Sequence, residues 1–271
     1  MKETFSLHQV TSATKFPFSA ESYSKFKFGC KDTSREFGIA LAEAFAWKYI
    51  ITRQLRGQIV VLSSPYCFIP TATFAMKDYF VQRLNQILVQ CNRPVVQETK
   101  IHRTITYKED YGELNAEQRF KLIQNDGFHM DTKFIEGKTL VFLDDIKITG
   151  SHERVIERML EGYGVENDRI FAYFAELTDP TIDPKVENIL NYAYVKNLLD
   201  LDKIIKNEAF VLNTRIVKYI LNYNHEDFVV FINFQRLKLV ESIYHLALGN
   251  SYHKIPDYQN NLNYIKNLLN K

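Results

Sequence analysis

The stretch Thr139-Leu-Val-Phe-Leu-Asp-Asp-Ile-Lys-Ile-Thr-Gly-Ser-His152 decides the fold of this 271-residue chain. It begins with the short apolar run Thr139–Leu143, which is typical of a buried parallel strand. Two acids, Asp144 and Asp145, follow, and after a short loop a helical pattern covers residues Ser151–Leu160. A strand, a polar loop and a helix in this order are typical of one unit of a parallel α/β sheet.

Similar units lie on both sides of this stretch. Further short runs with strand character predict strands at Gln58–Leu62, Val95–Ile101 and Arg169–Leu177. Helical spacing predicts a helix capped by Ser34 and running to about Arg53, and a second helix follows the first strand from about residue 71 to 89. Strands that alternate with helices predict a mainly parallel sheet flanked by helices, with the ligand at its carboxyl edge.

The last third of the chain has a different pattern. From about Pro184 it contains helical stretches at Val186–Leu199, Thr214–Leu221 and Asp227–Leu248, without convincing strands. We therefore expect an α/β domain over residues 1–180 and a helical extension over residues 181–271. The apolar faces of these helices are typical of packing surfaces, and they could cover the active site or form a dimer contact.

Composition excludes several classes of protein. Lys and Arg number 34 against 32 for Asp and Glu, so the balanced charge argues against nucleic acid as a partner. No apolar run approaches the roughly 20 residues of a membrane span, and the first residues lack the apolar core of a signal peptide. Three cysteines without a CxxC pair favour reduced thiols. We expect a cytoplasmic protein that has no contact with a membrane.

The acids and the loop suit a sugar phosphate. Asp144 and Asp145 stand at the carboxyl end of a strand, where their oxygens can accept hydrogen bonds from ribose hydroxyls. The loop from Lys147 to His152 precedes a helix, so its backbone N–H groups and hydroxyls can surround one phosphate. Gly150 lets the backbone approach that phosphate closely. An ordinary turn after a strand, or a metal-dependent phosphoryl-transfer site, are the alternatives.

This stretch resembles the phosphoribosyl-diphosphate motif of the type I phosphoribosyltransferases, which is an apolar strand, two acids and a Thr-Gly loop. The matching residues are Asp144, Asp145, Thr149 and Gly150. The resemblance implies that the two acids hold the ribose hydroxyls and act in catalysis, and that residues Ile148–His152 bind the 5-phosphate. It also implies Mg²⁺ as a cofactor, carried on the diphosphate and reaching the acids indirectly, with the substrate.

Two positions depart from the pattern of that family, which commonly has hydroxyl residues where this chain has Ile148 and His152. His152 can replace one donor through its ring N–H, and Lys147 can add positive charge. Glu153, however, places a carboxylate close to the same phosphate. The chain also resembles phosphoribosyltransferase-like proteins encoded in bacterial stress-resistance clusters, through residues 63–66 and 148–153.

Two further segments correspond to functional loops of the family. The turn Ser63-Ser64-Pro65-Tyr66 follows the first core strand, where the family contacts the diphosphate, although an ordinary turn is an equal alternative. The segment from His102 to Lys138 occupies the place of a mobile loop that closes over the reacting centre. It offers basic and polar side chains to the departing diphosphate, which are Arg103, Lys108, Tyr111 and Arg119, with Arg103 the best placed.

Two functions remain open from the sequence. The first is a phosphoribosyltransferase that transfers phosphoribose from magnesium-bound phosphoribosyl diphosphate to an unidentified acceptor. The second is a non-catalytic module that binds phosphoribosyl diphosphate or a nucleotide and reports its level to a partner. Members of the family often pair, so a homodimer is one of the assemblies left open. The acceptor is not readable, because in the family it is selected by a variable hood that carries no motif here.

Overall fold

The main sheet of the molecule is parallel throughout. The computed structural model describes residues 1–52, 55, 57–103, 127–206 and 209–270. Its five-stranded sheet has the order β1-β7-β6-β2-β3, and every neighbouring pair is parallel. The strands are β1 (Lys2–Val10), β2 (Ile59–Ser63), β3 (Gln97–Glu98), β6 (Thr139–Lys147) and β7 (Arg169–Leu177). A small antiparallel pair is formed by β4 (His102–Arg103) and β5 (Phe128–His129).

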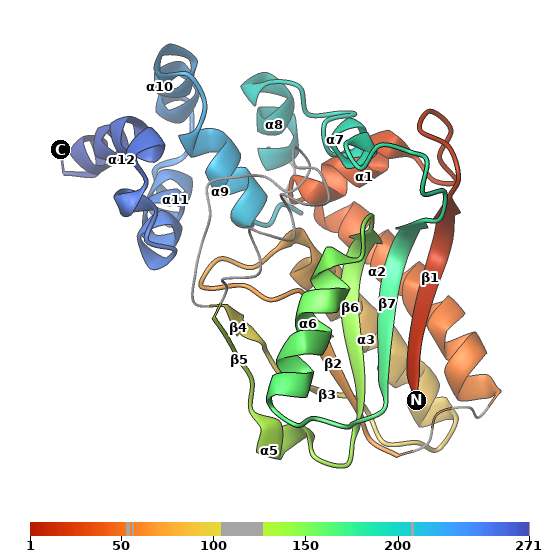
Figure 1. The fold of residues 1–271 in the computed structure, drawn as a ribbon. Helices are drawn as coiled ribbons and strands as arrows, with labels where there is room; N and C mark the ends of the chain where they lie inside the picture. Colours follow the sequence, from red (N-terminus) through yellow and green to blue (C-terminus); the bar gives the residue numbers. More distant parts are fainter. Residues whose placement is uncertain (53–54, 56, 104–126, 207–208, 271) are drawn as a thin grey trace.

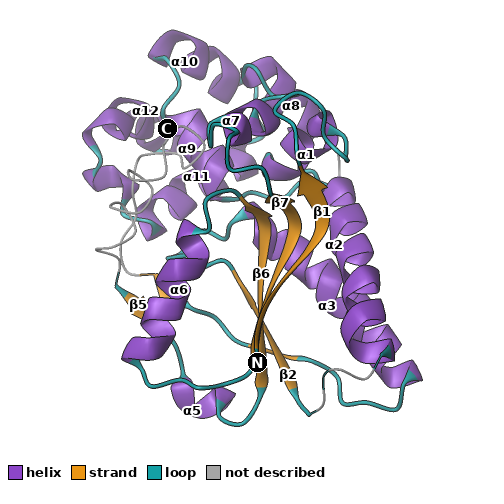
Figure 2. Ribbon diagram, turned by 45° about the vertical axis from the view of Figure 1, so that its right-hand side comes forward, coloured by secondary structure: helices purple, strands orange, loops and turns teal. Residues whose placement is uncertain are grey.

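Helices cover both faces of this sheet (Figure 2). The helices of the α/β part are α1 (Ala20–Lys27), α2 (Lys31–Ala46), α3 (Ala72–Gln90), α5 (Thr132–Ile135) and α6 (Ser151–Gly162), and α2 continues into one turn of π-helix, η1 (Trp47–Ile51). Helices α2 and α3 pack on one face, and α6 lies on the other (Figure 2). This is the predicted α/β class, a parallel sheet flanked by helices.

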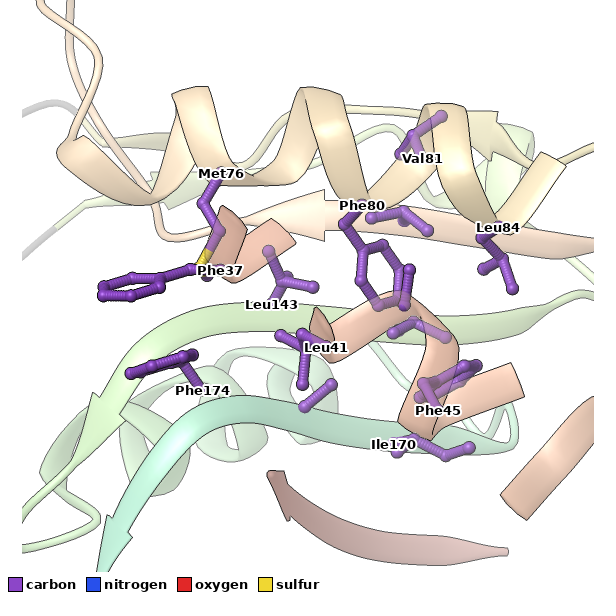
Figure 3. Close-up of a cluster of buried hydrophobic side chains, with 14 of the residues drawn as sticks. Phe37, Leu41, Phe45, Met76, Phe80, Val81, Leu84, Leu143, Ile170 and Phe174 are labelled. Carbon is purple, nitrogen blue, oxygen red and sulfur yellow. The ribbon is translucent and has the colours of Figure 1, made fainter. Parts of the chain in front are cut away.

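The side chains of β6 divide between two hydrophobic cores, one on each face of the sheet. Val141 and Leu143 belong to the core under α2 and α3, where Phe37, Phe80 and other large side chains interdigitate (Figure 3). Leu140 and Phe142 belong to the core under α6. Because side chains alternate along a strand, the next two residues, Asp144 and Asp145, are directed to opposite faces.

The remaining helices gather over the carboxyl ends of the strands (Figure 1). They are α7 (Val186–Asn191), α8 (Leu198–Ile205), α9 (Thr214–Leu221), α10 (His225–Asn233), α11 (Leu237–Gly249), η3 (Tyr252–Lys254) and α12 (Pro256–Leu269). Their apolar faces form a third core, which also takes in Phe28, Cys30 and Ile69 from the α/β part. In the part of the chain that is described, no helix is long and apolar enough to cross a membrane.

Several predicted boundaries were wrong. Strand β6 continues past Leu143 to Lys147, so the two acids lie inside the strand. The predicted strand Val95–Ile101 is paired only at Gln97–Glu98, because the chain leaves the sheet at its edge on both sides of this short contact. Strand β1 was not predicted as a paired strand, although the start was expected to be extended, and it forms the other edge of the sheet.

The predicted helix ends also differ from the structure. The helix expected to begin at Ser34 begins at Lys31, and the Ser34 hydroxyl donates to the Cys30 carbonyl from within the helix. The stretch Val186–Leu199 holds the short helix α7 and only the start of α8. The stretch Asp227–Leu248 is two helices, because the chain turns between α10 and α11. Helices α9 and α6 begin at the predicted residues.

Candidate active site

A cleft of about 920 Å³ lies where the carboxyl ends of the strands face the C-terminal helices. One wall, which we call the sheet wall, is formed by the end of β6, the loop that follows it and the turn after β2. The opposite wall, which we call the helical wall, carries side chains of α7, α9, α12 and their connections. A crevice beyond the carboxyl ends of parallel strands is the usual place for a ligand in this class of fold.

Asp144 lies at the base of the sheet wall. Its Oδ1 accepts hydrogen bonds from the hydroxyls of Ser64 at 2.6 Å and Thr73 at 3.1 Å, and its Oδ2 lies 3.2 Å from Nδ1 of His152. Burial opposes ionisation of Asp144, but the hydrogen bonds and charge of His152 and the bond from Ser64 outweigh it, so the pKa of Asp144 is held below its usual range. The carboxylate is therefore charged and directed at the loop that follows.

Asp145 has a different environment on the opposite face of the strand. Its side chain is 8% exposed and forms an ion pair with Lys27, and Tyr23 donates to it at 2.5 Å. Burial raises the pKa of Asp145 and Lys27 opposes the shift. Tyr23 and Lys27 both belong to α1, a helix that the sequence analysis did not predict. Asp145 thus fixes α1 against the sheet and holds the Lys27 ammonium at the cleft.

The loop predicted to bind phosphate combines a left-handed glycine, two hydroxyls and the start of a helix. Gly150 has a φ of +67°, which an L side chain rarely adopts, and it immediately precedes α6. The hydroxyls of Thr149 and Ser151 lie 2.8 Å apart and share a hydrogen bond. Arg154, which sequence reasoning missed, donates to the Thr149 carbonyl at 2.8 Å and to the Ser151 hydroxyl at 2.9 Å. The N-terminal end of α6 adds its positive dipole to this loop.

Lys147 and Ile148 line the cleft and also contact other parts of the protein. The Lys147 ammonium lies 2.9 Å from a carboxylate oxygen of Glu153 and 3.2 Å from one of Glu176. Burial would lower the pKa of Lys147, but these two carboxylates raise it above its usual value, so the ammonium stays charged. Its charge is balanced within the protein. Ile148 packs its side chain against the core under α2 and α3 while it also lines the cleft.

The turn after β2 lines the cleft, and the chain just beyond it is hydrogen-bonded to the C-terminal helices. Ser64 and Pro65 line the cleft, whereas Ser63 ends β2 opposite Leu143 and is not among the described lining residues. Asn250, which is 2% exposed, accepts hydrogen bonds at its Oδ1 from the backbone N–H groups of Phe68 at 2.9 Å and Ile69 at 3.0 Å. The C-terminal helices therefore hold the connection from β2 to α3 just after the turn that the family resemblance assigns to the diphosphate.

Arg103 is the described member of the predicted group of basic residues around the diphosphate. It belongs to β4, lines the cleft, and its backbone N–H donates to the Tyr66 carbonyl at 3.3 Å. Lys108, Tyr111 and Arg119 lie outside the described residues. The structure thus brings Arg103, Ser64, Asp144 and the loop of residues 147–152 to a single cleft.

The described residues do not form a closed metal site. Within the described ranges, no group of three or more His, Cys, Asp or Glu side chains is arranged to hold a metal ion. Each carboxylate oxygen of Asp144 and Asp145 already accepts a hydrogen bond from a neighbouring group. This donor set fits magnesium that arrives on the diphosphate of a substrate better than a resident ion coordinated directly by the two acids.

A parallel sheet with two acids at its carboxyl edge, followed by a Thr-Gly loop and a helix, is the arrangement of the phosphoribosyltransferase fold. The chain belongs to the PRTase ComF-like family, whose family model matches residues 1–265. Its structure is similar to hypoxanthine phosphoribosyltransferase from Staphylococcus aureus, with 12% identity, 54% of this chain and 75% of that chain covered, and a TM-score of 0.34. It is also similar to hypoxanthine phosphoribosyltransferase from Trypanosoma cruzi, with 16% identity, 55% of this chain and 76% of that chain covered, and a TM-score of 0.35. A search of curated proteins found no match.

Proposed function

We propose that this chain is a phosphoribosyltransferase that uses magnesium-bound phosphoribosyl diphosphate and releases diphosphate. The observation that carries the proposal is the position of Asp144 beside the loop of residues 147–152 in one cleft. Asp144 can accept from the ribose hydroxyls, and the N-terminal end of α6 can bind the 5-phosphate. These two parts of the site are close together in the chain and line one cleft, as a single ribose 5-phosphate requires.

The two acids have separate roles in this proposal. Asp144 contacts the ribose, because its Oδ2 accepts from His152 and a second lone pair of the same oxygen can accept from a ribose hydroxyl. Asp145 acts through Lys27, whose ammonium it holds at the cleft. This arrangement differs from the equal ribose contacts that the family resemblance implied for both acids.

In the reaction, the bond between the anomeric carbon and the diphosphate oxygen breaks, and the diphosphate departs with the bonding electrons. A nucleophilic atom of the acceptor then forms the new bond to the same carbon. Arg103, the Ser64 hydroxyl and the backbone of the turn after β2 surround the departing group, and magnesium carried by the substrate supplies further positive charge. Orientation of the two reactants contributes the rest of the acceleration.

The proposal is tested by measuring diphosphate release with a panel of nitrogenous acceptors. We expect release by the wild type and a loss of about 100-fold in turnover for Arg103→Gln, while the affinity for phosphoribosyl diphosphate changes less than tenfold. Arg83→Gln is the matched control, because Arg83 pairs with Glu43 on the outer surface of α2 and α3. Equal turnover in the Arg103 and Arg83 variants would contradict the role given to Arg103.

A binding-only module is the second candidate. It is favoured by the charge balance of the sheet wall, where Lys147 is neutralised by Glu153 and Glu176. Such a wall offers a developing diphosphate anion less positive charge than an unpaired lysine would. Tight binding of magnesium phosphoribosyl diphosphate without diphosphate release, across the whole acceptor panel, would favour this second function.

A further inference from the structure

Helix α9 has an apolar face in the C-terminal core and a polar face that lines the cleft. Its apolar face is the fully buried set Ile216, Val217, Ile220 and Leu221, which packs into the C-terminal core. Its polar face lines the cleft through Thr214, Arg215, Lys218 and Tyr219, and the two residues that follow the helix, Asn222 and Tyr223, continue this lining. These positions repeat at helical spacing, so one continuous stripe of α9 faces the sheet wall.

Three tyrosine rings on this wall support one another. The Tyr219 ring meets the ring of Tyr223 at a centroid distance of 5.5 Å and that of Tyr192 at 6.1 Å. Behind them lies Phe28, which is fully buried and contacts Tyr219 edge-on at 5.1 Å. Aromatic rings fixed in this way offer flat surfaces on which a planar ligand can stack at little cost in side-chain entropy.

Burial and the neighbouring tyrosines also raise the pKa of Tyr219 far above its usual value. Its hydroxyl is therefore neutral at physiological pH and shares a hydrogen bond with the side chain of Tyr223. The wall thus offers aromatic surfaces and polar tips rather than tyrosinate anions. A negatively charged ligand meets no repulsion from the Tyr219 side chain.

Positive charge lies beside these rings. The helical wall carries three basic side chains, Lys196, Arg215 and Lys218. Among its described residues, one acidic side chain, Glu187, also lines the cleft. The Arg215 guanidinium lies 6.0 Å from the centroid of the Tyr192 ring. Burial, Asp145 and Glu187 raise the pKa of Tyr23, and the charge of Arg215 opposes them. The cations of α9 therefore lie in the same cleft as the tyrosine rings and the Lys27–Asp145 pair.

We propose that the helical wall binds a planar anion, such as a heteroaromatic carboxylate, between the tyrosine rings and the cations Arg215 and Lys218. That this ligand is the acceptor of the phosphoribosyl group rests on the proposed function. A planar ligand can stack on the rings, and an anionic substituent can bind to the two cations on the polar stripe of α9. An anion without a ring, such as diphosphate, would use the cations but leave the tyrosines without a role.

The test is calorimetric titration of two pairs of probes that differ in charge, orotate against uracil and nicotinate against nicotinamide, with and without magnesium phosphoribosyl diphosphate. We expect each carboxylate to bind about tenfold more tightly than its uncharged counterpart. The double variant Arg215→Gln, Lys218→Gln should abolish this preference, and Tyr219→Leu should weaken both members of each pair. Lys203→Gln is the control, because Lys203 is a mostly exposed cation on α8 outside the cleft.

Each outcome separates this inference from the proposed function. If the wild type binds phosphoribosyl diphosphate but shows no preference for the carboxylates, the inference is overturned and the transferase proposal stands. If the double variant loses affinity for diphosphate and keeps its preference for the carboxylates, the cations serve the leaving group and the inference is again overturned. If the carboxylates bind through Arg215 and Lys218 while phosphoribosyl diphosphate does not bind, the inference holds and the transferase proposal fails.

Discussion

The two walls of the cleft carry charge in opposite ways. On the sheet wall the charges are matched within the protein, as in the ion pairs of Lys27 with Asp145 and of Lys147 with Glu153 and Glu176. On the helical wall the lining cations outnumber the acids among the described residues, and they stand beside tyrosine rings. Matched pairs fix the positions of side chains, whereas an excess of one charge attracts a ligand of the other. The ion pairs of the sheet wall therefore hold its side chains in fixed positions, whereas the role that we propose for the helical wall is to bind an anion.

The largest effect on stability is expected at the ion pair between α1 and β6. Lys27→Met leaves the buried Asp145 carboxylate without its cation, which costs about 4 kcal/mol in the free energy of unfolding. The folded-state pKa of Asp145 is already raised above its unfolded value, and the substitution raises it further. The cost is therefore greatest at neutral pH and shrinks as the pH falls and the carboxyl takes up a proton.

Urea unfolding at pH 7 and pH 5 measures this cost. The matched variant is Lys27→Met combined with Asp145→Asn, which removes both charges and should recover at least half of the lost stability. If Lys27→Met were as stable as the wild type at pH 7, the ion pair would not hold α1 to the sheet wall. The contrast between the two walls would then lose its main support.

A somewhat smaller effect is expected where α6 is attached to β7. Arg169 forms two hydrogen bonds to the buried Glu157 carboxylate, at 2.8 Å and 2.6 Å. Burial opposes ionisation of Glu157, but Arg169 outweighs it and the pKa of Glu157 is lowered. The ionised pair therefore stabilises the fold above the unfolded-state pKa of about 4.3, and this contribution is lost as the pH falls through the lower folded-state pKa.

Glu157→Gln should accordingly cost about 3 kcal/mol at pH 7 and clearly less near pH 3. Chemical denaturation followed by circular dichroism across this pH range measures both values. Glu36→Gln, at an exposed position of α2, is the control and should leave the unfolding free energy unchanged at every pH. A cost that does not vary with pH would mean that packing, not charge, attaches α6.

The smallest effect on stability is expected at Asn250, where the helical part holds the turn after β2. Asn250→Ala leaves the backbone N–H groups of Phe68 and Ile69 without this acceptor, at a cost of about 2 kcal/mol. The turn is also loosened, so the affinity for magnesium phosphoribosyl diphosphate should fall about fivefold. Calorimetry measures the affinity, and the exposed Asn263→Ala on α12 is the control. If the affinity of Asn250→Ala for magnesium phosphoribosyl diphosphate were unchanged, the turn after β2 would not take part in binding this ligand.

The sheet wall was largely predictable from the sequence, and the reason is local. The strand, the acids and the Thr149-Gly150 loop follow one another in a single stretch, so residues that act together are also neighbours in the chain. Strand Arg169–Leu177 and helix Thr214–Leu221 have the predicted bounds, because apolar runs and periodic patterns mark them clearly.

The helical wall was not predictable for the opposite reason. The polar stripe of α9 has the same pattern as the solvent face of any surface helix, and only the fold places it opposite Asp144. The role of α1 was hidden in the same way, since Tyr23 and Lys27 are more than 100 residues from Asp145 in the chain. Contacts between such distant segments leave no local pattern in a single sequence.

The remaining question is whether the cleft holds a phosphorylated ribose at all. Calorimetric titration of phosphoribosyl diphosphate with magnesium into the wild type, Asp144→Asn and the exposed control Asp32→Asn answers it. We expect micromolar binding to the wild type and to Asp32→Asn, and affinity at least about tenfold weaker for Asp144→Asn. No binding to the folded wild type, or equal binding by all three proteins, would contradict the phosphoribose site.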